Sequence, residues 1–95
     1  MNTYYFYMMA SKKNGTLYIG VTSNLPTRVW QHRQDVHEGF TRKYGVHRLV
    51  WYEGTTSISA AIKREKQVKK WRRQWKIDLI ERENLDWRDL YEDIL

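Results

Sequence analysis

Residues 4–22 read YYFYMMASKKNGTLYIGVT, which is two runs of aromatic and aliphatic residues separated by a polar segment with Asn14 and Gly15. Both runs have the length of a strand and are rich in residues that favour strands. An Asn-Gly pair is typical of a tight hairpin turn, because both residues tolerate positive φ angles. The stretch therefore predicts a β-hairpin with strands at residues 4–10 and 16–22.

A two-residue turn at Asn14 and Gly15 would set the register of this hairpin. Tyr7 would then pair with Thr22, and Tyr7 and Tyr18 would project from the same face. A bulge in the turn would break this pairing. Gly20 lies between Tyr7 and Tyr18 and has no side chain, which leaves room for a substrate or for the close approach of another backbone.

The next predicted element is a helix over residues 25–36. Asn24 is a favoured N-cap, and Pro26 suits the first helical turn. Arg28 lies four residues before His32, so the two side chains share a face that borders the apolar stripe. That stripe, which we expect to pack on the sheet, comprises Leu25, Val29, His32 and Val36.

Two more elements follow a glycine-rich and charged loop at residues 38–45. A third strand is predicted at residues 47–53, and Ser57 is a suitable N-cap for a second helix. The apolar stripe of that helix contains Ile58, Ala61, Ile62, Val68 and Trp71. With no linker, repeat or low-complexity segment, residues 1–95 read as a single domain.

Glu65 falls in the middle of the apolar stripe of the second helix. A carboxylate at such a position is costly to bury unless it is paired or binds a cation. An ion pair with a neighbouring Lys or Arg would explain it, and so would an edge position that reaches solvent. The residue pattern alone leaves these explanations and a metal ligand open.

Composition limits the classes of function. There is no Cys among the 95 residues, which excludes a disulfide framework, a thiolate metal site and a cysteine nucleophile. The net charge of +6 favours a polyanionic partner such as nucleic acid, with an anionic membrane as the weaker reading. No signal peptide or membrane span is visible, so the simplest expectation is a cytoplasmic protein without a membrane partner.

Five elements in order resemble the GIY-YIG nuclease family. They are Tyr5-Phe6-Tyr7, Tyr18-Ile19-Gly20, Arg28, His32 and Glu65. The resemblance covers roughly residues 4–83, and residues 84–95 form an acidic tail beyond it. The first motif departs from the family pattern, because Tyr5 replaces its Gly and Phe6 its Ile.

The resemblance implies an α/β protein of the α+β type, with a three-stranded antiparallel sheet flanked by helices. It implies a metal-dependent endonuclease that hydrolyses phosphodiester bonds in DNA, with RNA or a structured nucleic acid as further substrate classes. The residues matched to catalytic positions are Tyr7, Tyr18, Arg28, His32 and Glu65. Glu65 would bind Mg²⁺ or Mn²⁺, and Tyr7 would be the general base or orient the water.

In that assignment Tyr18 hydrogen-bonds beside Tyr7, His32 tunes or relays the proton, and Arg28 grips phosphate oxygens. Asn84 is a candidate for an Asn that several family members use beyond the glutamate helix. The residues expected to contact phosphates are Arg42, Lys43, Lys69, Lys70, Arg72 and Arg73.

Trp71 and Trp75 are expected to pack in the core with Leu79 and Ile80 rather than to stack on bases. Two alternatives come from other functional classes. One is a catalytically weak or inactive nucleic-acid-binding module with the same fold. The other is a protein-binding adaptor that uses the acidic tail at residues 84–95.

Overall fold

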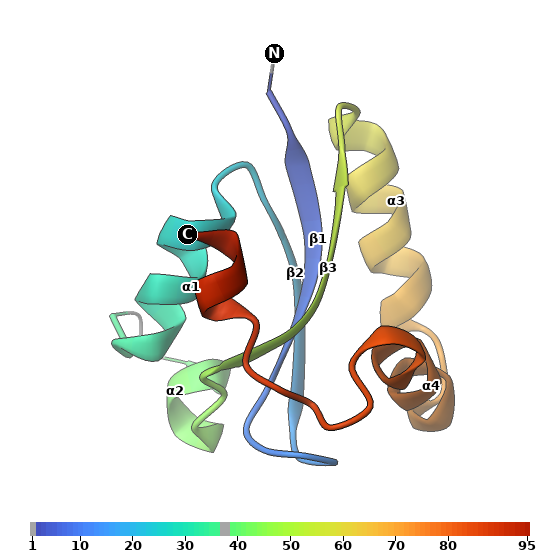
Figure 1. The fold of residues 1–95 in the computed structure, drawn as a ribbon. Coiled ribbons are helices and arrows are strands. Elements are labelled where there is room, and N and C mark those ends of the chain that lie inside the picture. The colour runs from blue at the N-terminus through green and yellow to red at the C-terminus, as the bar shows by residue number, and fades with distance from the viewer. Residues whose placement is uncertain (1, 37–38) are drawn as a thin grey trace.

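The computed structural model describes residues 2–36 and 39–95, which form a three-stranded antiparallel sheet between two groups of helices (Figure 1). Strand β1 (Tyr4–Ala10) is central, with β2 (Leu17–Thr22) and β3 (Arg48–Thr55) on either side of it. The α+β architecture and the antiparallel sheet expected from the sequence are therefore confirmed.

Helices cover both faces of the sheet. On one side lie α1 (Leu25–Arg33), α2 (Phe40–Tyr44) and the 3-10 helix η1 (Tyr91–Ile94), and on the other lie α3 (Ile58–Lys69) and α4 (Arg73–Glu83) (Figure 1). Each side encloses its own group of buried residues. On the α1 side these are Tyr7, Met9, Leu25, Val29, Val46 and Leu49. On the α3 side they are Phe6, Met8, Ala10, Ile19, Val50, Val68, Leu79, Ile80 and Trp87.

The hairpin is present, but its register differs from that of a two-residue turn. Tyr7 pairs with Gly20, and residues 12–15 form the loop. The Ser11 side chain accepts a hydrogen bond from the Thr16 amide, which favours this wider loop over a turn at Asn14 and Gly15 alone. The register shift is two residues, so Tyr7 and Tyr18 still project from the same face of the sheet.

Gly20 lies directly beneath the ring of Tyr7. A Cβ atom at position 20 would be 2.7 Å from the Tyr7 hydroxyl oxygen and 2.8 Å from Cζ, distances that real side chains do not tolerate. Tyr7 is fully buried, so its ring has no open space into which it can move. The expected space at Gly20 is therefore filled by Tyr7, and the glycine is required by that contact.

The α1 side differs from the sequence expectation in two places. Helix α1 starts as predicted, with the Asn24 side chain accepting from the Thr27 amide, but it ends at Arg33 and leaves Val36 exposed. The predicted loop at residues 38–45 contains the short helix α2, although Glu38 itself lies outside the described residues. Gly45 ends α2 in the left-handed conformation, with φ of 63°.

The α3 side confirms the predicted N-cap and corrects the predicted core. Ser57 caps α3 through the Ala60 amide, and within the expected stripe Ala61 and Val68 are buried, whereas the two isoleucines Ile58 and Ile62 are exposed. Trp71 packs against the core from beyond the end of α3. The core expectation for Trp75 is wrong, because it is half exposed and the guanidinium of Arg72 stacks on its ring.

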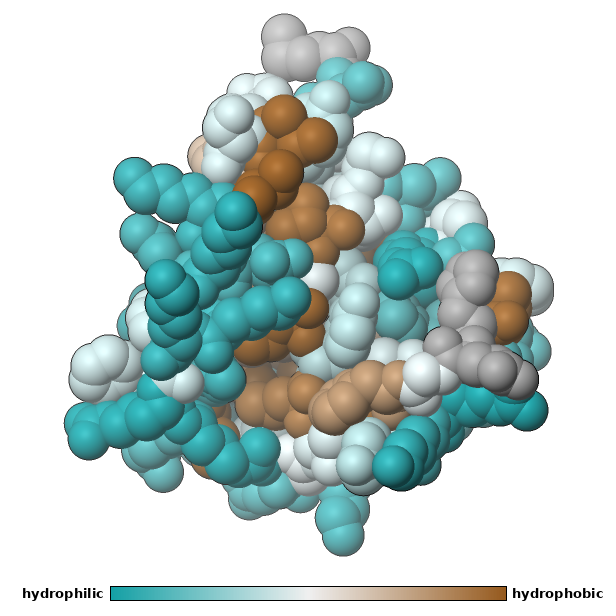
Figure 2. Space-filling model, turned by 180° about the vertical axis from the view of Figure 1, so that it is seen from behind, coloured by the Kyte–Doolittle hydropathy of each residue, from teal (hydrophilic) through white to brown (hydrophobic). Residues whose placement is uncertain are grey.

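The surface seen from behind is divided between polar and apolar areas. Figure 2 shows hydrophilic side chains gathered over the side of α3, next to an apolar band that runs down the middle of this face. The exposed residues of α3 include Lys63, Lys66 and Lys69. Among the helices of the described residues, none has the length and apolarity needed to cross a lipid bilayer.

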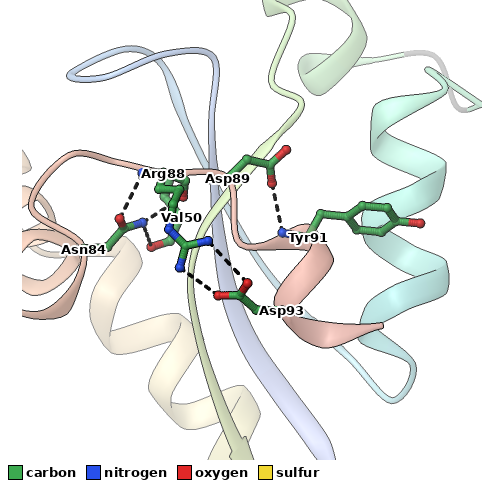
Figure 3. A network of polar contacts seen from close by, with 6 residues as sticks. All are labelled: Val50, Asn84, Arg88, Asp89, Tyr91 and Asp93. Atoms are coloured by element: carbon green, nitrogen blue, oxygen red, sulfur yellow. Dashed lines mark hydrogen bonds and ion pairs between the residues drawn. The ribbon is translucent and has the colours of Figure 1, made fainter.

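Asn84 joins the end of α4 to β3 (Figure 3). Its side-chain nitrogen donates to the carbonyls of Val50 and Arg88, at 3.1 Å and 2.9 Å, and its side-chain oxygen accepts from the Arg88 amide at 2.9 Å. Asn84 is buried, so these bonds replace the water that its amide would otherwise bind. Its position is explained by this network, which makes it a structural residue.

Replacing Gly20 with Ala should displace the Tyr7 ring and destabilise the protein by about 1–3 kcal/mol, the usual cost of overpacking a core. The measurement is the midpoint of thermal unfolding, which shifts by about 4–8 °C per kcal/mol in a domain of this size. Gly54→Ala is the matched control, because a Cβ there would be 3.2 Å from the edge of the Tyr5 ring, a less severe contact than the 2.7 Å at position 20. Equal losses in both variants would contradict the specific contact at Gly20.

Asn84→Ala should leave the buried carbonyl of Val50 without its donor and cost about 1–3 kcal/mol of unfolding free energy. Urea denaturation measures this loss. Asn14→Ala is not a suitable control, because Asn14 has a φ of 58° and Ala is strained at such an angle, so the exchange would itself cost stability. Gln67→Ala on the exposed face of α3 is suitable, and it should change stability by no more than about 0.5 kcal/mol.

Candidate active site

Four polar side chains meet where the hairpin packs against α1. Tyr7 comes from β1, Tyr18 from β2, and Arg28 and His32 from α1. The hydroxyl of Tyr7 is 3.0 Å from His32 Nε2, and Arg28 Nε donates to the same hydroxyl oxygen at 3.4 Å. The rings of Tyr18 and His32 are 4.9 Å apart between centroids. We call these four residues the polar quartet.

The sequence explains why the polar quartet forms. Pairing of β1 with β2 places Tyr7 and Tyr18 on one face, with ring centroids 6.1 Å apart. The Asn24 cap then starts α1 immediately after β2, and the four-residue spacing of Arg28 and His32 points both side chains at that face. The expectation that these four residues lie together therefore agrees with the geometry.

Thr41 is a contact that the sequence pattern did not reveal. Its hydroxyl oxygen lies 3.2 Å from His32 Nδ1, so α2 holds the imidazole from the side opposite Tyr7. If Tyr7 donates its proton to His32 Nε2, the imidazole must carry its own proton on Nδ1, where Thr41 accepts it. Thr41 falls in a segment expected to be a loop, which is why spacing alone gave no signal for it.

Burial shifts the pKa of Tyr7, and contacts with the two tyrosines shift the pKa of Arg28. Removal from water raises the pKa of the Tyr7 phenol well above its ordinary value, and the hydrogen bond from Arg28 opposes this shift only in part. Burial by itself would lower the pKa of Arg28, but its contacts with Tyr7 and Tyr18 outweigh that effect and raise it. At neutral pH the site therefore holds a neutral Tyr7 beside a charged guanidinium.

The four side chains differ in their access to solvent. Tyr7 is fully buried and His32 is 7% exposed, whereas Tyr18 and Arg28 are only half-buried. Tyr7 and His32 therefore form the buried floor of the site, and Tyr18 and Arg28 form its solvent-facing part. A molecule that approaches from solvent meets Arg28 and Tyr18 first.

Glu65 lies apart from the polar quartet. It belongs to α3, on the opposite side of the sheet, and its carboxylate forms an ion pair with Lys69 at 3.4 Å. Among the interactions of the described residues, no hydrogen bond or ion pair joins Glu65 to any member of the quartet. This contact is the ion pair with a neighbouring Lys that the sequence pattern left open for Glu65.

The donor set at Glu65 fits only one kind of metal site. Within residues 2–36 and 39–95 there is no group of three or more His, Cys, Asp or Glu side chains that could enclose an ion. A magnesium ion, however, is commonly held by one carboxylate together with water and substrate phosphates. The Glu65 side chain retains 21% of its exposure, and an exposed i,i+4 lysine partner is worth only about 0.3–0.5 kcal/mol. The residues present therefore fit such a single-carboxylate site.

The basic residues expected to meet phosphates have different surroundings. Lys70 lines an open groove along α3 together with Ile62, Lys63 and Lys66. Arg73, in contrast, donates to the carbonyls of Asn14 and Gly15 and so ties α4 to the hairpin loop. For the others, the ammonium of Lys69 pairs with Glu65, Lys43 lies over the ring of Tyr44, Arg72 lies over Trp75, and Arg42 is exposed on α2.

The acidic tail folds back onto the α1 side. Asp89 forms an ion pair with Arg33 of α1 and accepts from the amides of Leu49 and Tyr91. Asp93 pairs with Arg88 at 2.8 Å, and this contact lowers the pKa of Asp93 (Figure 3). Asp89 and Asp93 are therefore engaged within the molecule, whereas Asp86 and Glu92 of the same tail are exposed.

Comparison with known proteins identifies the family. Residues 3–78 match the model of the GIY-YIG catalytic domain. A UPF0213 protein of Staphylococcus haemolyticus is 33% identical over 81 residues, which cover 85% of this chain and 98% of that protein. A UPF0213 protein of Haloquadratum walsbyi is 31% identical over 81 residues, covering 85% of this chain and 91% of that protein.

A solved structure gives the same result. The solution NMR structure of a UPF0213 protein from Bacillus halodurans is similar with a TM-score of 0.57 and 26% identity, and the match covers 92% of each chain. The fold, the motif order and the matched region agree with one another. The chain belongs to the GIY-YIG nuclease family.

Proposed function

We propose that this protein is a metal-dependent endonuclease that hydrolyses phosphodiester bonds in DNA. The observation that supports the proposal most directly is the hydrogen-bonded meeting of Tyr7, Arg28 and His32, with Tyr18 at the solvent side. Hydrolysis of a phosphodiester needs a positively charged group beside the phosphate oxygens, a water positioned for attack, and a group that takes the proton of that water. The polar quartet offers groups for each of these needs.

Arg28 is the group that binds the phosphate. Its Nε is engaged with Tyr7, and its Nη1 donates to Gln31 at 3.3 Å, so the guanidinium is held in a fixed plane at the surface of the site. A planar guanidinium can contact two phosphate oxygens at once and remains charged at any biological pH. It therefore neutralises the charge that grows on the phosphate as water attacks.

The burial of the two tyrosines argues for exchanging the roles that the resemblance suggested for them. Tyr7 is inaccessible to solvent, and burial keeps it protonated, so it is poorly suited to contact the attacking water. Tyr18 is accessible and lies against His32. Tyr18 then orients the water and takes its proton, while Tyr18 passes its own proton to the Tyr7 oxygen and Tyr7 passes one to His32 Nε2.

This relay balances the reaction on the protein side. The hydroxide formed from water attacks phosphorus, one P–O bond breaks, and the leaving oxygen takes a proton from solvent. His32 ends as an imidazolium, which Thr41 continues to hold through Nδ1, and it returns the proton to water after the products leave. The last transfer runs along the 3.0 Å contact of Tyr7 with His32, and Tyr18 lies beside Tyr7 with ring centroids 6.1 Å apart.

Glu65 would hold the divalent cation. When bound, Mg²⁺ or Mn²⁺ supplies positive charge to the phosphate and stabilises the leaving oxygen. Helix α3 contacts β2, the edge strand that carries Tyr18, so a nucleic acid lying along the outer edge of β2 can contact both sides of the sheet. In this arrangement Arg28 would contact the phosphate from the α1 side of the sheet, and Glu65 would hold the cation on the α3 side.

A second candidate function is a nucleic-acid-binding module without catalysis. The pairing of Glu65 with Lys69, and its separation from the polar quartet, favours this candidate. The basic face of α3 would then supply phosphate contacts without a reacting centre. The two candidates differ in one measurable respect, which is whether DNA is cut when a divalent cation is present.

Wild-type protein should nick supercoiled plasmid in the presence of Mg²⁺ or Mn²⁺, and chelation with EDTA should abolish nicking. Glu65→Gln, Arg28→Lys and Tyr18→Phe should each lower the nicking rate by about 100-fold or more, because each removes a charge-stabilising or proton-transferring group. Agarose gel separation of nicked and supercoiled plasmid measures the rate.

Glu83→Gln is the matched control for Glu65→Gln, because it neutralises an exposed carboxylate at the end of α4. It should nick at the wild-type rate. Salt-sensitive DNA binding by the wild type with no metal-dependent nicking would contradict the enzyme and support the binding module. Nicking that persists at the wild-type rate in Glu65→Gln alone would contradict the role of Glu65, and nicking that persists in all three variants would identify a contaminating nuclease.

Tyr7 should also give a distinct signal in an alkaline titration. Its pKa is raised in the folded state, so its contribution to stability is complete below about pH 10, the unfolded value, and is lost as the pH rises toward the folded value. Subtracting the 295 nm titration of Tyr7→Phe from that of the wild type should show no phenolate up to about pH 11. A difference titration centred near pH 10 would contradict the burial of this phenol.

A further inference from the structure

Two exposed aromatic side chains extend the polar quartet along α2. The ring of Phe40 is 6.4 Å from that of Tyr18, and the ring of Tyr44 is 4.8 Å from that of Phe40. The series of rings therefore runs from His32 through Tyr18 and Phe40 to Tyr44. Phe40 and Tyr44 are each 47% exposed. Helix α2 contains no buried residue, so the two rings do not cover a buried part of their own helix. We call these two residues the α2 platform.

The α2 platform is held firmly despite the shortness of the helix. Thr41, between the two aromatic residues, contacts His32 Nδ1, and its carbonyl accepts from the amide of Val46, which is fully buried. The spacing of four residues puts Phe40 and Tyr44 on one side of α2. The two rings are thus held close to Tyr18. Helix α2 lies on the same side of the sheet as α1 (Figure 1).

We propose that the α2 platform stacks on an unpaired nucleobase next to the scissile phosphate, an inference that rests on the proposed nuclease function. Exposed aromatic rings next to cationic side chains are the features by which proteins hold single nucleotides. Lys43 lies over the Tyr44 ring, with Nζ 5.4 Å from the centroid, and Arg42 is exposed on the same short helix. The chemistry of the platform matches a base together with its flanking phosphates.

The occupant is a base rather than an apolar protein segment because of what surrounds the rings. Three of the five residues of α2 are Thr41, Arg42 and Lys43, and Tyr18 and His32 continue the ring series directly into the polar quartet. A base seated on Phe40 and Tyr44 would place its own phosphate near Tyr18 and Arg28. A base inside a duplex has both faces covered by its neighbours, so only an unpaired or displaced base can stack in this way.

The test uses oligonucleotides that carry 2-aminopurine, a fluorescent base that is quenched by stacking, in buffer with EDTA so that no strand is cut. One probe has the 2-aminopurine in an unpaired segment, and the other has it inside a complete duplex. Wild-type protein should quench the unpaired probe. The double variant Phe40→Ala with Tyr44→Ala should lose this quenching and weaken binding of the unpaired probe by at least about 10-fold.

Three comparisons make the result specific. The double variant should bind the duplex within about twofold of the wild type, because phosphate contacts are unchanged. Phe40→Tyr with Tyr44→Phe keeps both rings and should restore quenching and affinity. Trp75→Ala removes an aromatic ring of similar exposure, 48%, on the other side of the sheet, and it should bind both probes as the wild type does.

Equal weakening on both probes, unchanged binding of the unpaired probe, or the same loss in Trp75→Ala would each overturn the proposal. Cleavage separates this inference from the proposed function. If the wild type cuts DNA and the double variant binds and cuts the unpaired probe equally well, only the platform is wrong. If the platform results hold while no substrate is cut with Mg²⁺ or Mn²⁺, the base-stacking site stands and the nuclease activity is refuted.

Discussion

The buried hydroxyl of Tyr7 is the polar group on which the α1 side of the sheet depends. A hydroxyl without water must find a hydrogen-bond partner, or its burial costs about 1–3 kcal/mol. His32 and Arg28 supply the partners, which fixes the position of α1 over the hairpin, and Gly20 supplies the space for the ring. The contacts that hold α1 in place are therefore the same ones that assemble the polar quartet.

Much of this arrangement was predictable because it is local in sequence. The hairpin, the Asn24 cap and the Ser57 cap each depend on residues a few positions apart, and each is found where expected. The meeting of Tyr7, Tyr18, Arg28 and His32 follows, since strand pairing and helical spacing determine it with few long-range contacts. The hairpin register was less predictable, because it depends on the hydrogen bond from Thr16 to the Ser11 side chain.

Features that depend on long-range packing were not visible in the sequence. Helix α2 is too short to give a helical pattern, and its Thr41 becomes relevant only because it meets His32. Trp75 and Trp87 look alike as sequence signals, yet one is half exposed and the other fully buried, as the path of the chain after α4 decides. The position of Glu65 likewise depends on how α3 packs across the sheet, which no local spacing specifies.

The segment after α4 also has a consequence for how the molecule is made. Asp89 binds Arg33, and the Leu90 amide donates to the Leu49 carbonyl. Residues 89–94 therefore complete the cover over the α1 side of the sheet, the side that carries Tyr7 and Tyr18. A ribosome synthesises the polar quartet early, within residues 7–32, and these closing residues much later. The strands and α1 therefore precede, in order of synthesis, the segment that packs over them, so the α1 side of the core is complete only after Leu90, Tyr91 and Ile94 have docked.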